Sequence, residues 1–253
     1  MMPRISVAPG VAVALAGGLA ALACGTAAAQ PATPTPTPPR EPRVVLDSTL
    51  GATTLRGHGA DLTILASPFG PQHESGLRLR VTTATSRYVY WTDPARTARA
   101  SGLDTSVDLF AGYGFALDRG FLQIVGGPTF LWSEQRPPGG APASHIARSG
   151  VAFVVSYYGL PTERTMVFAQ GRYSTISSAY FVEGRVGLAV APRLHLGPEF
   201  AISGGEGYRQ WRVGAHLSGV QLGRLGLGIG AGFVEDRNTG EGAYVSARLL
   251  LPF

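Results

Sequence analysis

From residue 44 to residue 253 the chain alternates between apolar residues and polar residues or glycine, with a period of two. Successive side chains of a β-strand point to opposite faces, whereas a helix repeats every 3.6 residues, so this pattern predicts strands. The last segment shows it most clearly. Its apolar face is formed by Ala243, Val245, Ala247, Leu249, Leu251 and Phe253. Its other face carries Tyr244, Ser246 and Arg248. The chain is therefore expected to form sheets with one apolar face.

Twelve segments of this kind are expected, and most are longer than the five or six residues that are typical of strands in soluble proteins. They are 43–55, 57–68, 75–91, 102–117, 120–133, 148–160, 164–177, 178–191, 194–205, 207–221, 224–236 and 241–253. A tilted strand that crosses a membrane needs roughly 9 to 11 residues, which these segments provide.

The expected connections alternate between short and long, as they do in membrane barrels. Short turns are expected at 118–120, 191–193 and 223–224, and longer loops at 133–147 and 235–242. Two connections do not fit this scheme, since 67–74 is long for an inner turn and 56–57 is tight for an outer one. Barrels of ten or fourteen strands are therefore compatible with the sequence as well as one of about twelve.

The composition favours an apolar face that points outward. Hydrophobic residues make up 45% of the chain and charged residues only 15%, whereas soluble domains usually carry about 25% charged residues. A soluble sandwich or lipocalin-like barrel would turn its apolar face inward. The polar faces, however, combine glycine, arginine and glutamate, which suits a wet lumen. The expected fold is thus all-β, an antiparallel up-and-down transmembrane β-barrel.

The carboxy terminus supports the same interpretation. The chain ends on Phe253, and Leu251 and Leu249 precede it at every second position. This ending resembles the terminal strand by which the barrel-assembly machinery recognises outer-membrane barrels for insertion. Pro252 as the penultimate residue departs from that pattern.

Two further segments precede the expected barrel. Residues 1–29 combine Arg4, an apolar run over 11–23 and Ala27-Ala28-Ala29, which together indicate a secretory signal peptide. A lipidated Cys24 is the alternative, although the residues before it depart from the usual lipobox. Residues 30–42 hold six prolines and predict a semi-rigid periplasmic tether before the barrel at 43–253. The expected location is the bacterial outer membrane.

Several ionisable residues fall on the polar faces of the expected strands and are candidates for the lumen. They are Arg172, Glu183, Arg185, Glu199, Arg212, His216 and Arg248. They could line a selective pore or fill a narrow barrel with ion pairs, and both interpretations remain open.

The sequence offers little that points to catalysis, and neither a cofactor nor a metal ion is expected. The one arrangement to weigh is His216-Leu217-Ser218, because outer-membrane phospholipases and lipid A deacylases carry a His-x-Ser pair. Those families place the pair on the lipid-facing surface, usually followed by Asn. Here Gly219 follows, and the alternation assigns His216 and Ser218 to the polar face. No catalytic residue is therefore assigned, and a lumen histidine is the preferred interpretation.

The net charge of +5 comes from basic residues that are scattered singly along the chain. No run of Lys or Arg marks a binding site for nucleic acid or anionic lipid. Nucleic acid is therefore not an expected partner.

Four short stretches resemble the family of the cellulose biosynthesis protein BcsS, whose members are predicted outer-membrane barrels. The stretches are 108–114, 196–200, 208–216 and 242–244, and the resemblance spans roughly 44–253. It implies a non-enzymatic accessory role in cellulose production or export, and it carries over no functional residues. The expected partners are outer-membrane lipid and the barrel-assembly machinery, and cellulose or other secretion components are further candidates. A general diffusion porin is the alternative, followed by a lipid-hydrolysing enzyme that uses His216 and Ser218.

Overall fold

The computed structural model describes residues 42–92, 97–140 and 142–253. The predicted signal peptide, residues 1–29, and the predicted tether up to residue 41 lie outside the described residues. Within the described part, no helix is long and apolar enough to cross a membrane.

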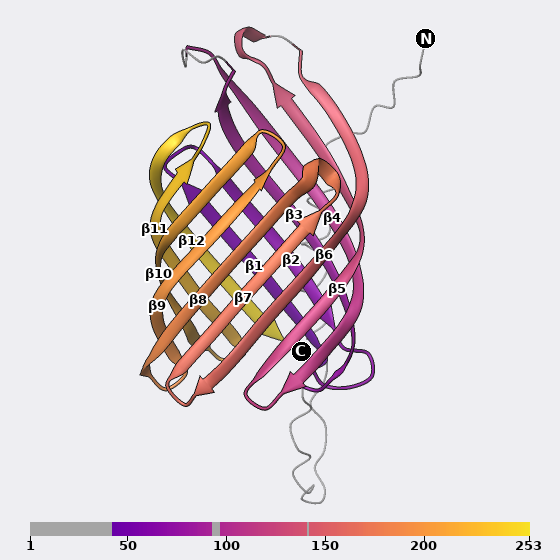
Figure 1. The fold of residues 1–253 in the computed structure, drawn as a ribbon, viewed down its shortest axis with the longest axis vertical. Coiled ribbons are helices and arrows are strands. Elements are labelled where there is room, and N and C mark those ends of the chain that lie inside the picture. Colours follow the sequence, from indigo (N-terminus) through magenta and orange to yellow (C-terminus); the bar gives the residue numbers. More distant parts are fainter. Residues whose placement is uncertain (1–41, 93–96, 141) are drawn as a thin grey trace, which may run out of the picture. The chain divides into compact units, whose positions relative to one another are not determined.

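The described part of the chain is a closed barrel of twelve antiparallel strands (Figure 1). The strands are β1 (Val44–Thr53), β2 (His58–Ala66), β3 (Gly76–Trp91), β4 (Arg99–Leu117), β5 (Gly120–Arg136), β6 (Ser144–Thr162), β7 (Thr165–Ser174), β8 (Ala179–Ala191), β9 (Leu194–Gly205), β10 (Tyr208–Leu222), β11 (Leu225–Asp236) and β12 (Gly240–Pro252). Each strand pairs with its neighbours in the chain, and β1 pairs with β12 to close the sheet. The predicted fold class and the preferred strand number are confirmed.

The outer wall is apolar, as the alternation predicted. Side chains such as Val213, Leu188 and Ile229 are 47%, 62% and 58% exposed on this wall. The inner faces hold polar side chains together with a small apolar cluster, described below. Exposed apolar rows all around a closed sheet are stable only against lipid, because in water they would associate or aggregate.

Three strands are longer than the sequence indicated. β4 begins at Arg99, β5 continues to Arg136, and β6 begins at Ser144, with Gln135 paired to Ser144. The predicted outer loop 133–147 is therefore reduced to the short segment 137–143, of which residue 141 is not described. The added strand ends are mostly polar on both faces, so hydrophobic periodicity does not reveal them.

In the sequence of β3 the apolar residues change parity, from Leu77, Leu79 and Val81 to Tyr88 and Tyr90, which suggests either a bulge or an aromatic girdle, and the structure shows neither at Tyr88. The pairing of β3 with β4 runs without interruption from Gly76 to Trp91, so there is no bulge. Tyr88 points into the barrel, where its hydroxyl donates a hydrogen bond to Asp104 Oδ1 at 3.3 Å. It therefore does not belong to an outer aromatic girdle. A bulge occurs instead in β10, between Ser218 and Val220.

Both ends of the described barrel lie at the same end of the molecule, since Val45 pairs with Pro252. The connections at this end are mostly two residues long, at 118–119, 163–164, 192–193 and 223–224, with 67–75 as the exception. Membrane barrels have short periplasmic turns and longer external loops. The end at which β1 begins and β12 ends is therefore assigned to the periplasm.

Candidate functional site

Four of the predicted lumen residues meet in one cluster, which we call the central cluster: Glu183, Arg185, Glu199 and Arg212. Arg185 contacts both carboxylates, at 3.2 Å to Glu199 and 3.4 Å to Glu183. Arg212 adds a longer contact of 3.8 Å to Glu183. The hydroxyl of Tyr244 donates to Glu199 Oε1 at 2.7 Å. Two positive and two negative side chains from β8, β9 and β10 thus compensate one another in the interior.

Arg248, on the inner face of β12, has partners on two walls. It donates two hydrogen bonds to Asp47 on the neighbouring β1, at 2.9 Å and 2.5 Å. Its guanidinium carbon also lies 4.9 Å from the ring centre of Phe168 on β7. Because β8 to β11 separate these strands on the shorter path around the barrel, this cation–π contact crosses the lumen.

A second contact crosses the lumen between β4 and β7. Arg172 donates to both oxygens of Asp108, with nitrogen–oxygen distances of 3.1 to 3.2 Å. The side chain of Asp108 is only 4% exposed, and Thr129 donates a further hydrogen bond to it at 2.5 Å. A carboxylate this deeply buried requires a compensating cation, which Arg172 supplies from across two intervening strands.

An apolar cluster fills the interior next to β4, β5 and β6. It consists of Phe110, Val125, Ala152 and Val154, each no more than 4% exposed. Apolar side chains packed this closely exclude water from their part of the lumen. Together with the contacts from opposite walls, they occupy the middle of the barrel with side chains.

His216 and Ser218 lie on the inner face of β10, as the alternation predicted. The Nδ1 atom of His216 is 2.9 Å from Ser218 Oγ, and its Nε2 atom is 3.3 Å from the backbone oxygen of Val186. In an activated Ser–His pair, an acidic side chain usually orients the base from its second nitrogen. Here a backbone carbonyl takes that position, and His216 is only 2% exposed. Lipid at the outer wall therefore has no route to this pair in the observed structure.

Sequence reasoning missed several interior residues that the structure shows to be partners in these contacts. Asp47 and Asp108 compensate the charges of Arg248 and Arg172, and Tyr244 completes the central cluster. Their inward parity in β1, β4 and β12 was the available signal. Among the described residues, no group of three or more His, Cys, Asp or Glu side chains is placed to hold a metal ion.

Arg78 is a further missed residue, and it ties down the one long connection at the periplasmic end. Its side chain donates to Ser67 Oγ at 2.7 Å and to the backbone oxygen of Gln72 at 3.1 Å, and it also contacts the backbone oxygen of Glu74. Arg78 is only 1% exposed. The segment 67–75 is thus held against the barrel by a guanidinium that rises from the inner face of β3.

The carboxy-terminal residue takes part in closing the barrel. Phe253 N donates to the oxygen of Val44 at 2.8 Å, and Arg43 N donates to the oxygen of Phe253 at 3.1 Å. Phe253 as a whole is 60% exposed. Leu249 and Leu251 lie on the same strand, β12, and pair with Ser48 and Leu46. Whether these residues form the insertion signal stays a prediction.

A closed antiparallel sheet with an apolar outer wall and paired charges inside defines the class of outer-membrane β-barrels. Solved structures of this class resemble the chain in fold. The transport unit of the autotransporter AIDA-I from Escherichia coli is 10% identical with a TM-score of 0.54, over 85% of this chain and 91% of that one. The KdgM porin is 11% identical with a TM-score of 0.46, over 83% and 99% of the two chains.

Within this class the chain belongs to one family. The pattern of the cellulose biosynthesis protein BcsS matches residues 61–253, from the middle of β2 to the carboxy terminus. No curated protein matches the chain. The chain is therefore a member of the BcsS family, an outer-membrane barrel linked to cellulose biosynthesis.

Proposed function

We propose that this protein is a non-enzymatic barrel that retains or organises cellulose at the outer membrane after the polymer has been made. The observation that carries the proposal is the family match over residues 61–253, which includes nearly the whole barrel. A barrel in the outer membrane has no access to the cytoplasmic sugar nucleotide, so its role follows polymerisation.

The interior supports a role in retention over one as a conduit. The Arg172–Asp108 and Arg248–Phe168 contacts cross the lumen, and the central cluster lies on the wall between them. A passing polysaccharide or a freely diffusing solute would have to break these contacts. The same geometry weakens the alternative of a general diffusion porin, which needs a lumen lined by side chains but not bridged by them.

We further propose how the protein is exported and that it catalyses no hydrolysis. Residues 1–29 direct secretion, 30–42 form a periplasmic tether, and the barrel-assembly machinery reads the ending at Phe253. The burial of His216 and the inward position of Ser218 support the absence of hydrolysis. In this proposal the barrel contacts outer-membrane lipid along its wall and cellulose or other secretion components at its external end.

Deletion of the gene tests the proposal through two measurements made in parallel. Dye binding or fibre imaging on whole cells should show reduced or disorganised surface cellulose. Glucose incorporation by isolated inner membranes should stay near normal, because the barrel acts after synthesis. Complementation with Ser218→Ala should restore the surface cellulose as fully as the unaltered gene.

Other outcomes would each reject a defined part of the proposal. An equal loss in both measurements would point to a direct role in the synthase. A failure of Ser218→Ala alone, with a folded barrel, would favour lipid hydrolysis. No change in either measurement would favour the porin.

A further inference from the structure

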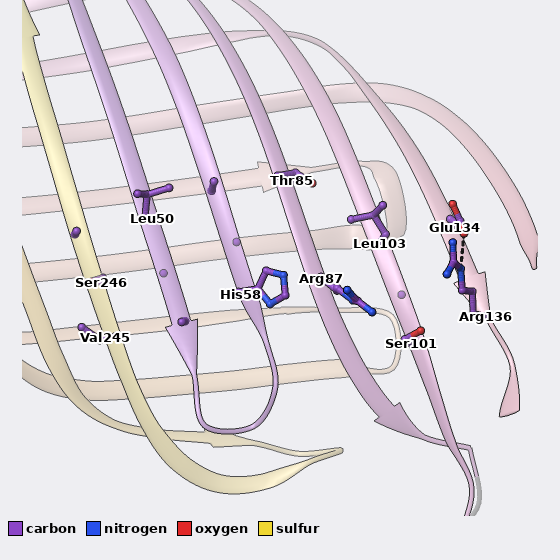
Figure 2. Close-up of a pocket in the computed structure, with 16 residues that line it drawn as sticks. Leu50, His58, Thr85, Arg87, Ser101, Leu103, Glu134, Arg136, Val245 and Ser246 are labelled. Atoms are coloured by element: carbon purple, nitrogen blue, oxygen red, sulfur yellow. Dashed lines mark hydrogen bonds and ion pairs between the residues drawn. The ribbon is translucent and has the colours of Figure 1, made fainter. Parts of the chain in front are cut away.

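A hollow with a defined lining lies on the outer wall of the barrel. It is a groove of about 680 Å³ over β12 and β1 to β5, in the half of the barrel away from the start of β1 and the end of β12 (Figure 2). Strand register shows which way its lining points. Leu50, Ala60, Leu103 and Val245 share the parity of the exposed apolar wall, and Leu50 and Val245 are 48% and 57% exposed.

The upper part of the groove follows one row of paired outward residues. Going from β12 to β5, the row reads Val245, Ala52, His58, Arg87, Leu103 and Glu134. Figure 2 shows His58 and Arg87 side by side on β2 and β3. Arg136, two residues beyond Glu134, pairs with it at 2.7 Å and lies at the edge of the groove. This row and the adjoining Arg136 therefore bring two arginines, a histidine and one glutamate together on the outer wall.

The next row of outward residues, which borders the cations, consists of uncharged side chains, most of them small. It runs through Ala247, Leu50, Ala60 and Thr85 on β12 to β3. The floor also includes backbone at Gly51, Gly59 and Gly102, which have the parity of the inner face, so no side chain from these positions projects into the groove. A groove of this volume is within the range of about 300 to 1,000 Å³ that is typical of ligand sites.

Charged side chains on the lipid-facing wall are destabilising at the bilayer centre and are tolerated near the interface. Trp132, on the outer face of β5 two residues from Glu134, is 49% exposed. Tryptophan in this position is typical of the aromatic girdle at the interface. The cations therefore lie at headgroup depth, with the small apolar floor directed towards the acyl chains.

Arg87 is exposed and has no ion pair or side-chain hydrogen bond with any residue in the described part of the chain. We propose that this groove binds a phosphorylated glycolipid of the outer leaflet, of the lipid A type. Phosphate groups are held by Arg87, His58 and Arg136, and an acyl chain lies over Ala60, Leu50 and Val245. Arginine suits this task because its guanidinium binds phosphate through paired hydrogen bonds.

The sequence alone does not reveal this site, because His58, Arg87 and Arg136 are far apart in the chain. Strand pairing brings them together. The proposal depends on the outer-membrane location and on the exposure of this end to the outside. It does not depend on cellulose, so the two proposals fail or succeed separately.

The test measures binding of bisphosphorylated lipid A to the purified mature protein in neutral detergent micelles. Arg87→Gln combined with Arg136→Gln should weaken binding about tenfold or more, because two charge-assisted contacts are lost. Arg164→Gln combined with Arg224→Gln removes the same charge at the periplasmic turns and should leave binding unchanged. Heat-modifiable gel migration verifies that each variant is folded.

Two further measurements distinguish binding in this groove from a general attraction of anionic lipids to the protein. Ala60→Trp fills the floor without changing charge and should weaken binding by a similar factor. Monophosphorylated lipid A and phosphatidylglycerol should each bind about tenfold more weakly than the bisphosphorylated form. The proposal is overturned if the control pair weakens binding as much as the groove pair. It is equally overturned if Ala60→Trp has no effect or if phosphatidylglycerol binds as tightly.

Discussion

The environment of Asp108 distinguishes most clearly between a packed interior and a water-filled one. Its side chain is 4% exposed, and its cation is supplied by Arg172 from across the lumen. In a wide aqueous pore the same pair would be solvated and would contribute little to stability. In the observed interior, removal of one partner leaves an uncompensated buried charge.

Substitution Arg172→Met should therefore lower the free energy of unfolding by about 3–5 kcal/mol. Denaturant unfolding in detergent or lipid vesicles measures this change. Arg136→Met is the control, because the side chain of Arg136 is 69% exposed in its pair with Glu134 and should contribute less than about 1 kcal/mol. Equal effects of the two substitutions would show that Asp108 is hydrated and that the lumen is open.

The sequence predicts which charged residues face the interior, but it does not predict their partners. Alternation assigns Arg172 and Arg248 to inner faces, because an outer wall in lipid must be apolar. It does not tell which residues they contact, since Arg172 and Asp108 are 64 positions apart and Arg248 and Asp47 are 201 positions apart. The first pairing depends on which strands face each other across the lumen, and the second depends on the closure of β12 onto β1.

At the scale of the strand, Gly219 marks the clearest departure from simple alternation. Its φ is +93°, a conformation that favours glycine, and a side chain there would collide with the backbone oxygen of Arg193. The bulge shifts the pairing so that Val220 faces Leu227 on the outer wall. The outward positions of β10 therefore change from odd to even within one strand.

Spin labels placed singly along residues 211–222 should report this switch. Oxygen accessibility, which is high in lipid, should peak at 211, 213, 215 and 217 and then at 220 and 222. The matched control is β12, whose pairing has no shift, so residues 243–251 should peak at odd positions throughout. An unbroken odd series in β10 as far as residue 221 would contradict the bulge.

Hydrophobic periodicity predicts some features of the strands and not others. The number of strands and most of their bounds were predictable, because apolar residues must recur on every strand that faces lipid. The polar ends of β5 and β6 were not, since neither of their faces is apolar there. The orientation of Tyr88 was not predictable either, because an aromatic side chain suits both a membrane interface and a hydrogen bond to Asp104.

For the whole molecule, the bridged interior predicts how the barrel behaves in an electrical measurement. The purified protein in a planar lipid bilayer should show no long-lived conductance of the kind that general porins give. Arg172→Ala combined with Arg248→Ala removes the contacts to Asp108 and Phe168 that cross the lumen and should produce measurable channels. Arg136→Ala, on the outer wall, should leave the membrane as tight as the unaltered protein does. Stable channels in the unaltered protein would contradict a closed interior.

The cellular role is best tested by where cellulose goes when the barrel is missing. In a deletion strain, cellulose is quantified separately in the cell-attached, medium and periplasmic fractions. Retention at the outer membrane predicts that total cellulose stays near normal while the polymer moves from the cell-attached fraction to the medium. Accumulation in the periplasm would instead show that the polymer passes through the barrel, and it would contradict both the closed interior and the proposed role.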